Sequence, residues 1–149
     1  RATLVDRQKI VSDDTLAQFR ALGWPVEIVV ADVFDWLAAF PNSTDAVVAN
    51  LFLHHFADEE LAEMLRLIAA RTQLFLACET RREWPSFAAS RLLGWLGCNS
   101  VTRNDAVISM RAGFKGQELS ALWPAGGGWQ LEERHAIVFT HLFAARRTS

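Results

Sequence analysis

Short apolar runs that each precede a polar residue recur through the chain, and they constrain its fold more than any other feature of the sequence. The runs cover residues 3–5 before Asp6, 26–30 before Asp32, 46–49 before Asn50 and 74–78 before Glu79. Each is too short for a stable helix and is rich in strand-forming residues. Continuous apolar runs of this length are typical of strands buried on both faces, as in a parallel sheet.

Segments with helical spacing separate these runs. Asp58 is expected to cap the clearest helix, whose apolar residues recur at positions 61, 64, 65 and 68. Ser12 is expected to cap a helix over residues 13–22. Further helices are expected over residues 33–40, 85–96, 104–110 and 116–123. Because parallel neighbours need a long crossover, strands joined by helices predict parallel pairing.

The end of the chain has a different pattern. Residues 129–136 alternate loosely between apolar and polar, and residues 138–145 are also strand-like, so the two segments predict an antiparallel pair. The three glycines at 126–128 predict a local turn before this pair. Together these patterns predict an α/β fold with a mostly parallel sheet, helices on both faces and a C-terminal antiparallel hairpin.

The composition of the 149 residues excludes several classes of protein. Hydrophobic residues make up 51%, which excludes a disordered chain and provides the core of one domain. The formal net charge of -2 leaves no basic surplus for nucleic acid or an anionic membrane. Cys78 and Cys98 are too few for a disulfide framework, and neither has a Cys or His at metal-ligand spacing. We therefore expect a cytoplasmic protein with no metal site, membrane span or signal peptide.

Polar residues at the ends of parallel strands mark the edge of the sheet where ligands bind in open α/β folds. Asp6 and Asp32 follow successive predicted strands. One carboxylate is suited to accept hydrogen bonds from ribose hydroxyls and the other from an adenine amino group, and a charged acceptor strengthens such bonds. Each aspartate taken alone also fits a turn former or a helix cap. The pair favours a nucleoside site, with a structural role as the alternative for each residue.

Three segments together resemble the class I S-adenosylmethionine-dependent methyltransferases, especially the small-molecule branch of that family. They are Leu-Val-Asp at residues 4–6, Val-Val-Ala-Asp-Val-Phe at 29–34, and Asp-Ala-Val-Val-Ala-Asn-Leu-Phe-Leu-His-His-Phe at 45–56. Their order and spacing match the second, third and fourth strand segments of the family, and the His-His-Phe ending is the most specific part. The resemblance covers almost the whole chain and implies a Rossmann-like methyltransferase sheet with a terminal antiparallel hairpin.

The same resemblance implies roles for residues at the strand ends. S-adenosylmethionine would lie across these ends, and its three parts would each meet different residues. The implied positions are Asp6 at the ribose, Asp32 at the adenine amino group, Val33 and Phe34 beside the adenine ring, and the backbone of Asn50 and Leu51 at the methionine part.

The chain departs from the family in one respect, because the family's first strand and glycine-rich loop have no counterpart here. That strand lies centrally in the family's sheet, between the strands that here end at Asp6 and Asn50. Its absence would leave backbone donors and acceptors unpaired. We therefore expect residues 1–149 to be the C-terminal portion of one methyltransferase domain, from the second strand onward. A longer parent or a partner chain would supply a further strand and helix.

His54 and His55 are the candidate general bases, since histidine titrates near neutrality and methyl transfer needs a base when the acceptor arrives protonated. Packing or cofactor contact is the alternative for both, and His55 is the stronger candidate. Glu79 is expected to orient the substrate, to cap a helix or to lie at the surface. His135 and His141, in the terminal hairpin, are expected to be packed or exposed rather than to act as bases.

These observations favour S-adenosylmethionine-dependent methyl transfer to a small-molecule acceptor, with oxygen as the expected methyl-accepting atom. An NAD(P)-dependent oxidoreductase of Rossmann type is one alternative, because that fold also places an acidic residue after its second strand. A non-catalytic methyltransferase-like interaction domain is another, given the missing glycine-rich loop. Aromatic residues within 84–95 are candidates for a substrate-facing wall or for core. The expected partners are a small-molecule substrate and, as an option, a second copy forming a homodimer.

Overall fold

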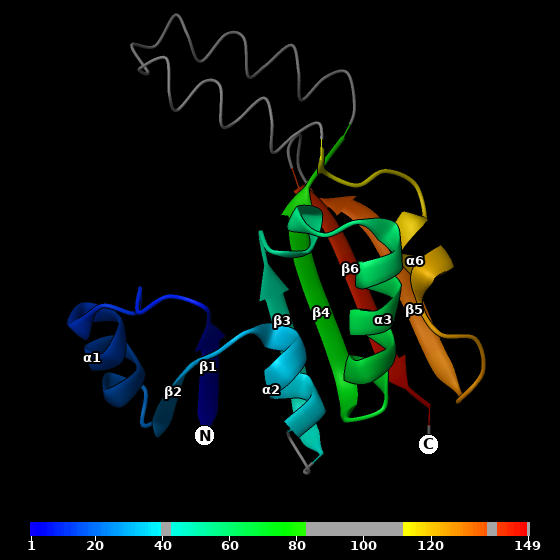
Figure 1. Cartoon of the computed structure of the whole chain (residues 1–149). Coiled ribbons are helices and arrows are strands. Elements are labelled where there is room, and N and C mark those ends of the chain that lie inside the picture. The colour runs from blue at the N-terminus through cyan, green and yellow to red at the C-terminus, as the bar shows by residue number, and fades with distance from the viewer. Residues whose placement is uncertain (40–42, 83–111, 137–139, 149) are drawn as a thin grey trace, which may run out of the picture. The chain divides into compact units, whose positions relative to one another are not determined.

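The computed structural model describes residues 1–39, 43–82, 112–136 and 140–148 (Figure 1). The helices expected over 85–96 and 104–110, the aromatic residues of 84–95 and Cys98 all lie outside the described residues. The chain divides into unit 1, Arg1–Asn42, and unit 2, Ser43–Ser149, and each unit is described by itself. No helix in the described ranges is long and apolar enough to cross a membrane.

Unit 1 consists of a two-stranded parallel sheet and two helices. Its elements are β1 (Ala2–Asp6), α1 (Asp13–Ala21), β2 (Val26–Val30) and α2 (Val33–Ala39). β1 and β2 pair along their whole length, with Asp6 opposite Val30. Ser12 caps α1 by accepting a hydrogen bond from the Thr15 amide at 3.2 Å. The predicted strands, their parallel pairing and the Ser12 cap are confirmed.

Unit 2 is built on a four-stranded sheet, with α3 and α6 lying over one of its faces (Figure 1). Its elements are β3 (Thr44–Asn50), the 3-10 helix η1 (Leu53–His55), α3 (Asp58–Ala69), β4 (Thr72–Thr80), α6 (Glu118–Leu122), β5 (Trp129–Ala136) and β6 (Thr140–Arg147). β3 and β4 are parallel, whereas β6 runs antiparallel to both β4 and β5. The predicted parallel pair and the terminal hairpin are confirmed, and β6 lies between β4 and β5.

The described strands are divided between two sheets. β1 and β2 form one, and β3, β4, β6 and β5 form the other. The family resemblance puts one more strand between β1 and β3 in the order of the sheet. That additional strand, and with it the interpretation of this chain as part of one methyltransferase domain, stays a prediction.

The core of unit 2 lies between α3 and the sheet. The apolar face predicted for α3 is buried, and its members are each at most 3% exposed: Leu61, Met64, Leu65 and Ile68. From the sheet, Phe75 of β4 and Phe143 of β6 are also buried, and Trp123 stacks on Phe75 with ring centroids 5.6 Å apart. This packing fixes α3 and the end of α6 on the strands whose ends carry the polar residues.

Two predicted helix starts are wrong by one or two residues. Ala57, not Asp58, is the N-cap of α3. Glu60 accepts a hydrogen bond from the Ala57 amide at 3.3 Å, so Asp58 begins the helix and contributes its charge to the first turn. α6 begins at Glu118 rather than near Gly116, because Gly116 has a left-handed backbone with φ of 59° that a helix excludes.

The strands of unit 2 also extend beyond their predicted ends. β4 continues through Glu79 to Thr80, because β6 pairs with it as far as Thr80 opposite Thr140. β6 in turn runs to Arg147, and residues 138 and 139 of its predicted start lie outside the described residues. Glu79 is therefore a residue within the strand and not the residue that ends it.

A short bridge joins the end of β4 to the chain before α6. The Phe114 amide donates to the Thr80 carbonyl at 2.9 Å, and the Arg82 amide donates to the Phe114 carbonyl at 2.9 Å. This pairs Arg81 with Phe114 in parallel orientation. Gly113 lies buried against the strand, where an added Cβ would be 2.8 Å from the Thr80 carbonyl carbon. Only a residue without a side chain fits this position.

We therefore expect Gly113→Ala to lower the free energy of unfolding by about 1 to 3 kcal/mol, the usual cost of forcing atoms into packed space. Denaturant titration of the protein measures this change. Gly116→Asn is the matched control, because nothing lies within 4 Å of a Cβ there and asparagine tolerates the left-handed backbone. Equal stability of Gly113→Ala and the wild type would contradict the close approach to Thr80.

Candidate active site

The carboxyl ends of β1 and β2 bring Asp6 and Asp32 to the same edge of the sheet in unit 1. Because the strands are parallel, Asp6, the last residue of β1, and Asp32, two residues after β2, both lie at this edge. The Ala31 amide donates to the Asp6 carbonyl at 3.0 Å, so backbone pairing continues just past β2. Both aspartates are half-buried. The two carboxylates predicted to share a nucleoside are thus on neighbouring strand ends.

Each of these carboxylates uses one oxygen to shape its own turn. Asp6 Oδ1 accepts a hydrogen bond from the Gln8 amide at 2.7 Å, and Asp32 Oδ1 accepts one from the Phe34 amide at 2.8 Å. The turn-forming alternative therefore fits Asp6, and the helix-cap alternative fits Asp32, whose side chain accepts the amide of the second residue of α2. Asp32 Oδ2 lies 3.8 Å from Arg7 Nε, beyond hydrogen-bonding distance. This contact is a long ion pair, so within the described residues neither second oxygen accepts a hydrogen bond, although that of Asp32 faces a guanidinium.

The start of α2 follows Asp32 directly. Val33 is the first residue of this helix and Phe34 the second, and both side chains are half-buried. The Trp36 amide donates to the Asp32 carbonyl at 2.9 Å, which closes the first turn of the helix. The two residues predicted to lie beside an adenine ring therefore have a fixed backbone next to the second carboxylate.

The turn after β3 carries Asn50 and Leu51, the residues predicted to face the methionine part of a cofactor. Both side chains are exposed. Leu51 has a φ of 51°, a left-handed conformation that costs a residue with a Cβ about 1 to 2 kcal/mol. Its amide donates to the Cys78 carbonyl at 2.8 Å, which ties the turn to β4. Nothing in the sequence signals this conformation, because the residue is neither glycine nor asparagine.

Glu79 is the centre of the polar contacts below this turn. Its Oε1 accepts hydrogen bonds from the Phe52 amide at 2.9 Å and the Leu53 amide at 2.8 Å. Its Oε2 lies 2.7 Å from His54 Nδ1. The residue is only 1% exposed, so the predicted surface role is wrong. Of the alternatives, the contacts correspond to capping, since the carboxylate accepts the amides of Phe52, the N-cap of η1, and of Leu53, its first residue.

The two adjacent histidines differ in their surroundings. The His54 side chain is 5% exposed and its Nδ1 is held by Glu79, whereas His55 is exposed. Their rings lie with centroids 4.2 Å apart at an angle of 41°. A general base must reach both solvent and the acceptor, so the geometry favours His55 over His54.

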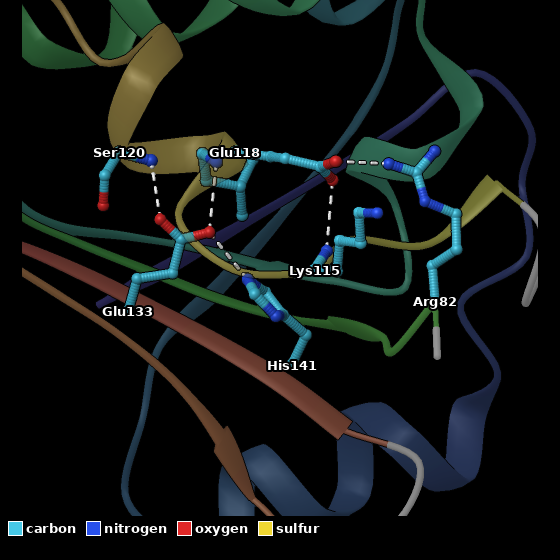
Figure 2. Close-up of polar contacts among 7 residues, drawn as sticks. Arg82, Lys115, Glu118, Ser120, Glu133 and His141 are labelled. Atoms are coloured by element: carbon cyan, nitrogen blue, oxygen red, sulfur yellow. Dashed lines mark hydrogen bonds and ion pairs between the residues drawn. The ribbon is translucent and has the colours of Figure 1, made fainter. Parts of the chain in front are cut away.

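Glu133 of β5 forms a second buried polar centre, which Figure 2 shows in close-up. Its carboxylate accepts hydrogen bonds from the Leu119 amide at 3.1 Å and the Ser120 amide at 2.7 Å, both in α6. Its Oε1 also lies 2.7 Å from His141 Nε2, and both side chains are fully buried. Of the two alternatives expected for His141, packed or exposed, the structure shows the packed one. Glu133 was missed, because an acidic residue in an alternating strand usually faces solvent.

The two buried glutamates are bonded in the same way. Each accepts two successive backbone amides and holds one imidazole nitrogen. Glu79 lies opposite His141 in the pairing of β4 with β6, so the two centres are neighbours on the sheet. The partners of both carboxylates are N–H groups and imidazole nitrogens. Among the described residues, no group of three His, Cys, Asp or Glu side chains could hold a metal ion.

The surroundings of Glu133 shift its titration. Burial raises the pKa of this carboxyl, but the hydrogen bonds from His141, Ser120 and Leu119 outweigh that effect. The pKa of Glu133 therefore lies below its ordinary value of 4.5. Hydrogen bonds to the charged form have this effect wherever they compensate the loss of hydration.

Comparison with known proteins gives the fold. No protein-family model and no curated protein matches the sequence. Among solved structures, an O-methyltransferase family protein from Burkholderia thailandensis is 19% identical, with a TM-score of 0.64 over 99% of this chain and 43% of that chain. The plantazolicin methyltransferase BpumL, solved with SAH, is 11% identical, with a TM-score of 0.66 over 98% of this chain and 66% of its own.

A third solved structure agrees with these two. The magnesium protoporphyrin IX methyltransferase ChlM from Synechocystis PCC 6803, with bound SAH, is 12% identical, with a TM-score of 0.53 over 98% of this chain and 63% of its own. The chain therefore has a Rossmann-like α/β fold like that of solved methyltransferases. It spans 43% of the first of these proteins and less than two thirds of each of the other two.

The lowered pKa of Glu133 predicts how stability depends on pH. A carboxyl with a lower pKa in the folded state stabilises the protein above pH 4.5, and this contribution is lost as the pH falls through the folded-state pKa. We expect Glu133→Gln to reduce stability at neutral pH and to flatten the decline in acid. Denaturant titrations between pH 7 and about pH 3 measure both effects. Glu132→Gln, an exposed neighbour, is the control and keeps the wild-type slope.

Proposed function

We propose that the protein transfers a methyl group from S-adenosylmethionine to a small-molecule acceptor, with oxygen as the accepting atom. The observation that carries this proposal is the pair of carboxylates on adjacent parallel strand ends, in a fold that solved methyltransferases share. Two of those solved proteins hold SAH, the product that S-adenosylmethionine leaves. The NAD(P)-dependent oxidoreductase is not favoured, because these structural matches are all methyltransferases.

The proposed cofactor contacts use the residues at the ends of the strands. Asp6 accepts hydrogen bonds from the ribose hydroxyls, and Asp32 accepts one from the adenine amino group. Val33 and Phe34 cover the adenine ring. The backbone of Asn50 and Leu51 meets the methionine part. Their exposure suits contact with a ligand, since neither side chain contributes to the core.

The chemistry asked of this chain is modest. The sulfonium of the cofactor supplies an electrophilic methyl group, so the protein must align the acceptor with it and exclude water. For a hydroxyl acceptor a proton must also be removed, and His55 is the residue we propose for this task. His54 is proposed to hold the His55 ring in place, because its own Nδ1 is bonded to Glu79 and its ring lies beside that of His55. We also propose that the protein is cytoplasmic and forms a homodimer.

Asp6→Ala should weaken binding of S-adenosylhomocysteine by about 1.5 to 3 kcal/mol, the range for hydrogen bonds to a charged group. This corresponds to about 10- to 150-fold in the dissociation constant. Isothermal titration of the whole protein measures it, with NAD titrated in parallel. Asp45→Ala is the control, because Asp45 is exposed at the opposite end of β3 from Asn50. Unchanged affinity in Asp6→Ala would remove the ribose role, and binding of NAD alone would favour the oxidoreductase.

His55→Ala should lower turnover by about 100- to 10,000-fold, the usual contribution of a general base, while the affinity for S-adenosylhomocysteine stays the same. Transfer of a labelled methyl group to a panel of phenols measures the rate. The deficit should shrink as the pH approaches the pKa of the phenol, because the acceptor then loses its proton to solvent. His135→Ala, another exposed histidine, is the control. Full turnover in His55→Ala would exclude it as the base, and binding without turnover in the wild type would favour a non-catalytic domain.

A further inference from the structure

We infer that Glu79 is the positioning residue of the turn that receives the methionine part of the cofactor. The inference rests on the proposed function, in which the backbone of Asn50 and Leu51 forms that part of the site. The inference identifies the side chain that fixes the conformation of this backbone. That group is a buried carboxylate more than 25 residues further along the chain, and it acts without touching a ligand.

The turn needs a support from outside itself. Leu51 has a left-handed backbone, which residues with a Cβ seldom adopt. The residue is 51% exposed, so its burial does not compensate the strain. The hydrogen bond from its amide to the Cys78 carbonyl fixes one point of the turn. A second point is required to set the direction in which the chain continues into η1.

Glu79 supplies that second point. One oxygen of its carboxylate accepts the two amides that directly follow Leu51, those of Phe52 and Leu53. Leu53 is fully buried, so the turn is fixed by packing as well as by the carboxylate. Because the carboxylate is buried, water does not compete for these hydrogen bonds, and a charged acceptor in the interior makes them strong. The backbone from Asn50 to Leu53 is therefore held between β4 and the core.

The same carboxylate also acts on the two histidines. Its second oxygen holds His54 Nδ1, and the His54 ring lies against that of His55. One side chain therefore fixes both the backbone proposed for the cofactor and the orientation of the ring next to the proposed base. Glu79 therefore connects the Asn50–Leu51 backbone with the pair of histidines in unit 2.

Glu133 provides a matched control within the same sheet. It is buried, accepts two successive backbone amides and holds one imidazole nitrogen, as Glu79 does. Its amides belong to α6, and nothing in the proposed function involves that helix. Replacing either glutamate removes a buried carboxylate with three partners, so the general effect on stability is matched. Only Glu79 should affect cofactor binding beyond that effect.

The test compares Glu79→Gln and Glu133→Gln in the whole protein. The thermal midpoint is measured without ligand, and the dissociation constant for S-adenosylhomocysteine is measured by titration well below that midpoint. We expect both variants to have lowered midpoints. Glu79→Gln should also bind about tenfold more weakly, as when only a tenth of the molecules hold the competent turn. Glu133→Gln should bind like the wild type.

The outcomes separate this inference from the function on which it rests. Tight binding by the wild type with equal affinities in the two variants would overturn the role of Glu79 and leave the methyltransferase proposal standing. Absence of binding by the wild type would overturn the proposed function and this inference with it. Weaker binding in Glu79→Gln alone supports both.

A measurement on the wild type covers the case in which Glu79→Gln fails to fold. Amide hydrogen exchange is followed residue by residue with and without S-adenosylhomocysteine. We expect the ligand to slow exchange at Phe52 and Leu53 about tenfold or more, because it stabilises the turn they belong to. The amides of Leu119 and Ser120, which Glu133 holds, should be slowed less, by no more than the stabilisation of the whole fold by the ligand. Equal responses at the two pairs of amides would contradict a specific role for Glu79.

Discussion

The polar centres of this molecule depend on one constraint, which is that a buried carboxylate must replace every hydrogen bond it had in water. An uncompensated charge in the interior costs several kcal/mol or more, so such a residue survives only with donors on all sides. Glu79 and Glu133 both meet the constraint with two backbone amides and an imidazole. Because these donors include backbone amides of η1 and α6, the two carboxylates fix both helices to the sheet.

Much of the fold could be predicted from the sequence, because its strands are short apolar runs and its main helix has a regular apolar face. β1 to β4, α3 and the terminal hairpin follow from these local patterns. The predicted end of β4 is wrong because the determining contact is distant: β4 reaches Thr80 only because β6 pairs with it there, and no local window contains that partner. The predicted cap of α3 is wrong for a local reason. The Glu60 side chain turns back to the Ala57 amide three residues earlier, so the helix begins at Asp58.

The candidate site was predicted unevenly for a similar reason. Asp6 and Asp32 can be proposed from the sequence because a polar residue after an apolar run is a local signal with a known place in parallel sheets. The sequence does not single out Glu133 and allows three roles for Glu79, because burial depends on what packs over a strand. His54 and His55 are identical in type and adjacent in sequence. Only the carboxylate beside one of them distinguishes a supporting residue from an exposed one.

The bridge between Arg81 and Phe114 has a consequence for how such a chain can diversify. Two backbone hydrogen bonds join the end of β4 to Phe114, and Gly113 lies close against Thr80. Closing a longer or shorter excursion across a junction of this kind changes the entropy only slowly with length. A change in the number of residues between Arg82 and Gly113 should therefore leave this junction, and with it the register at the end of β4, in place.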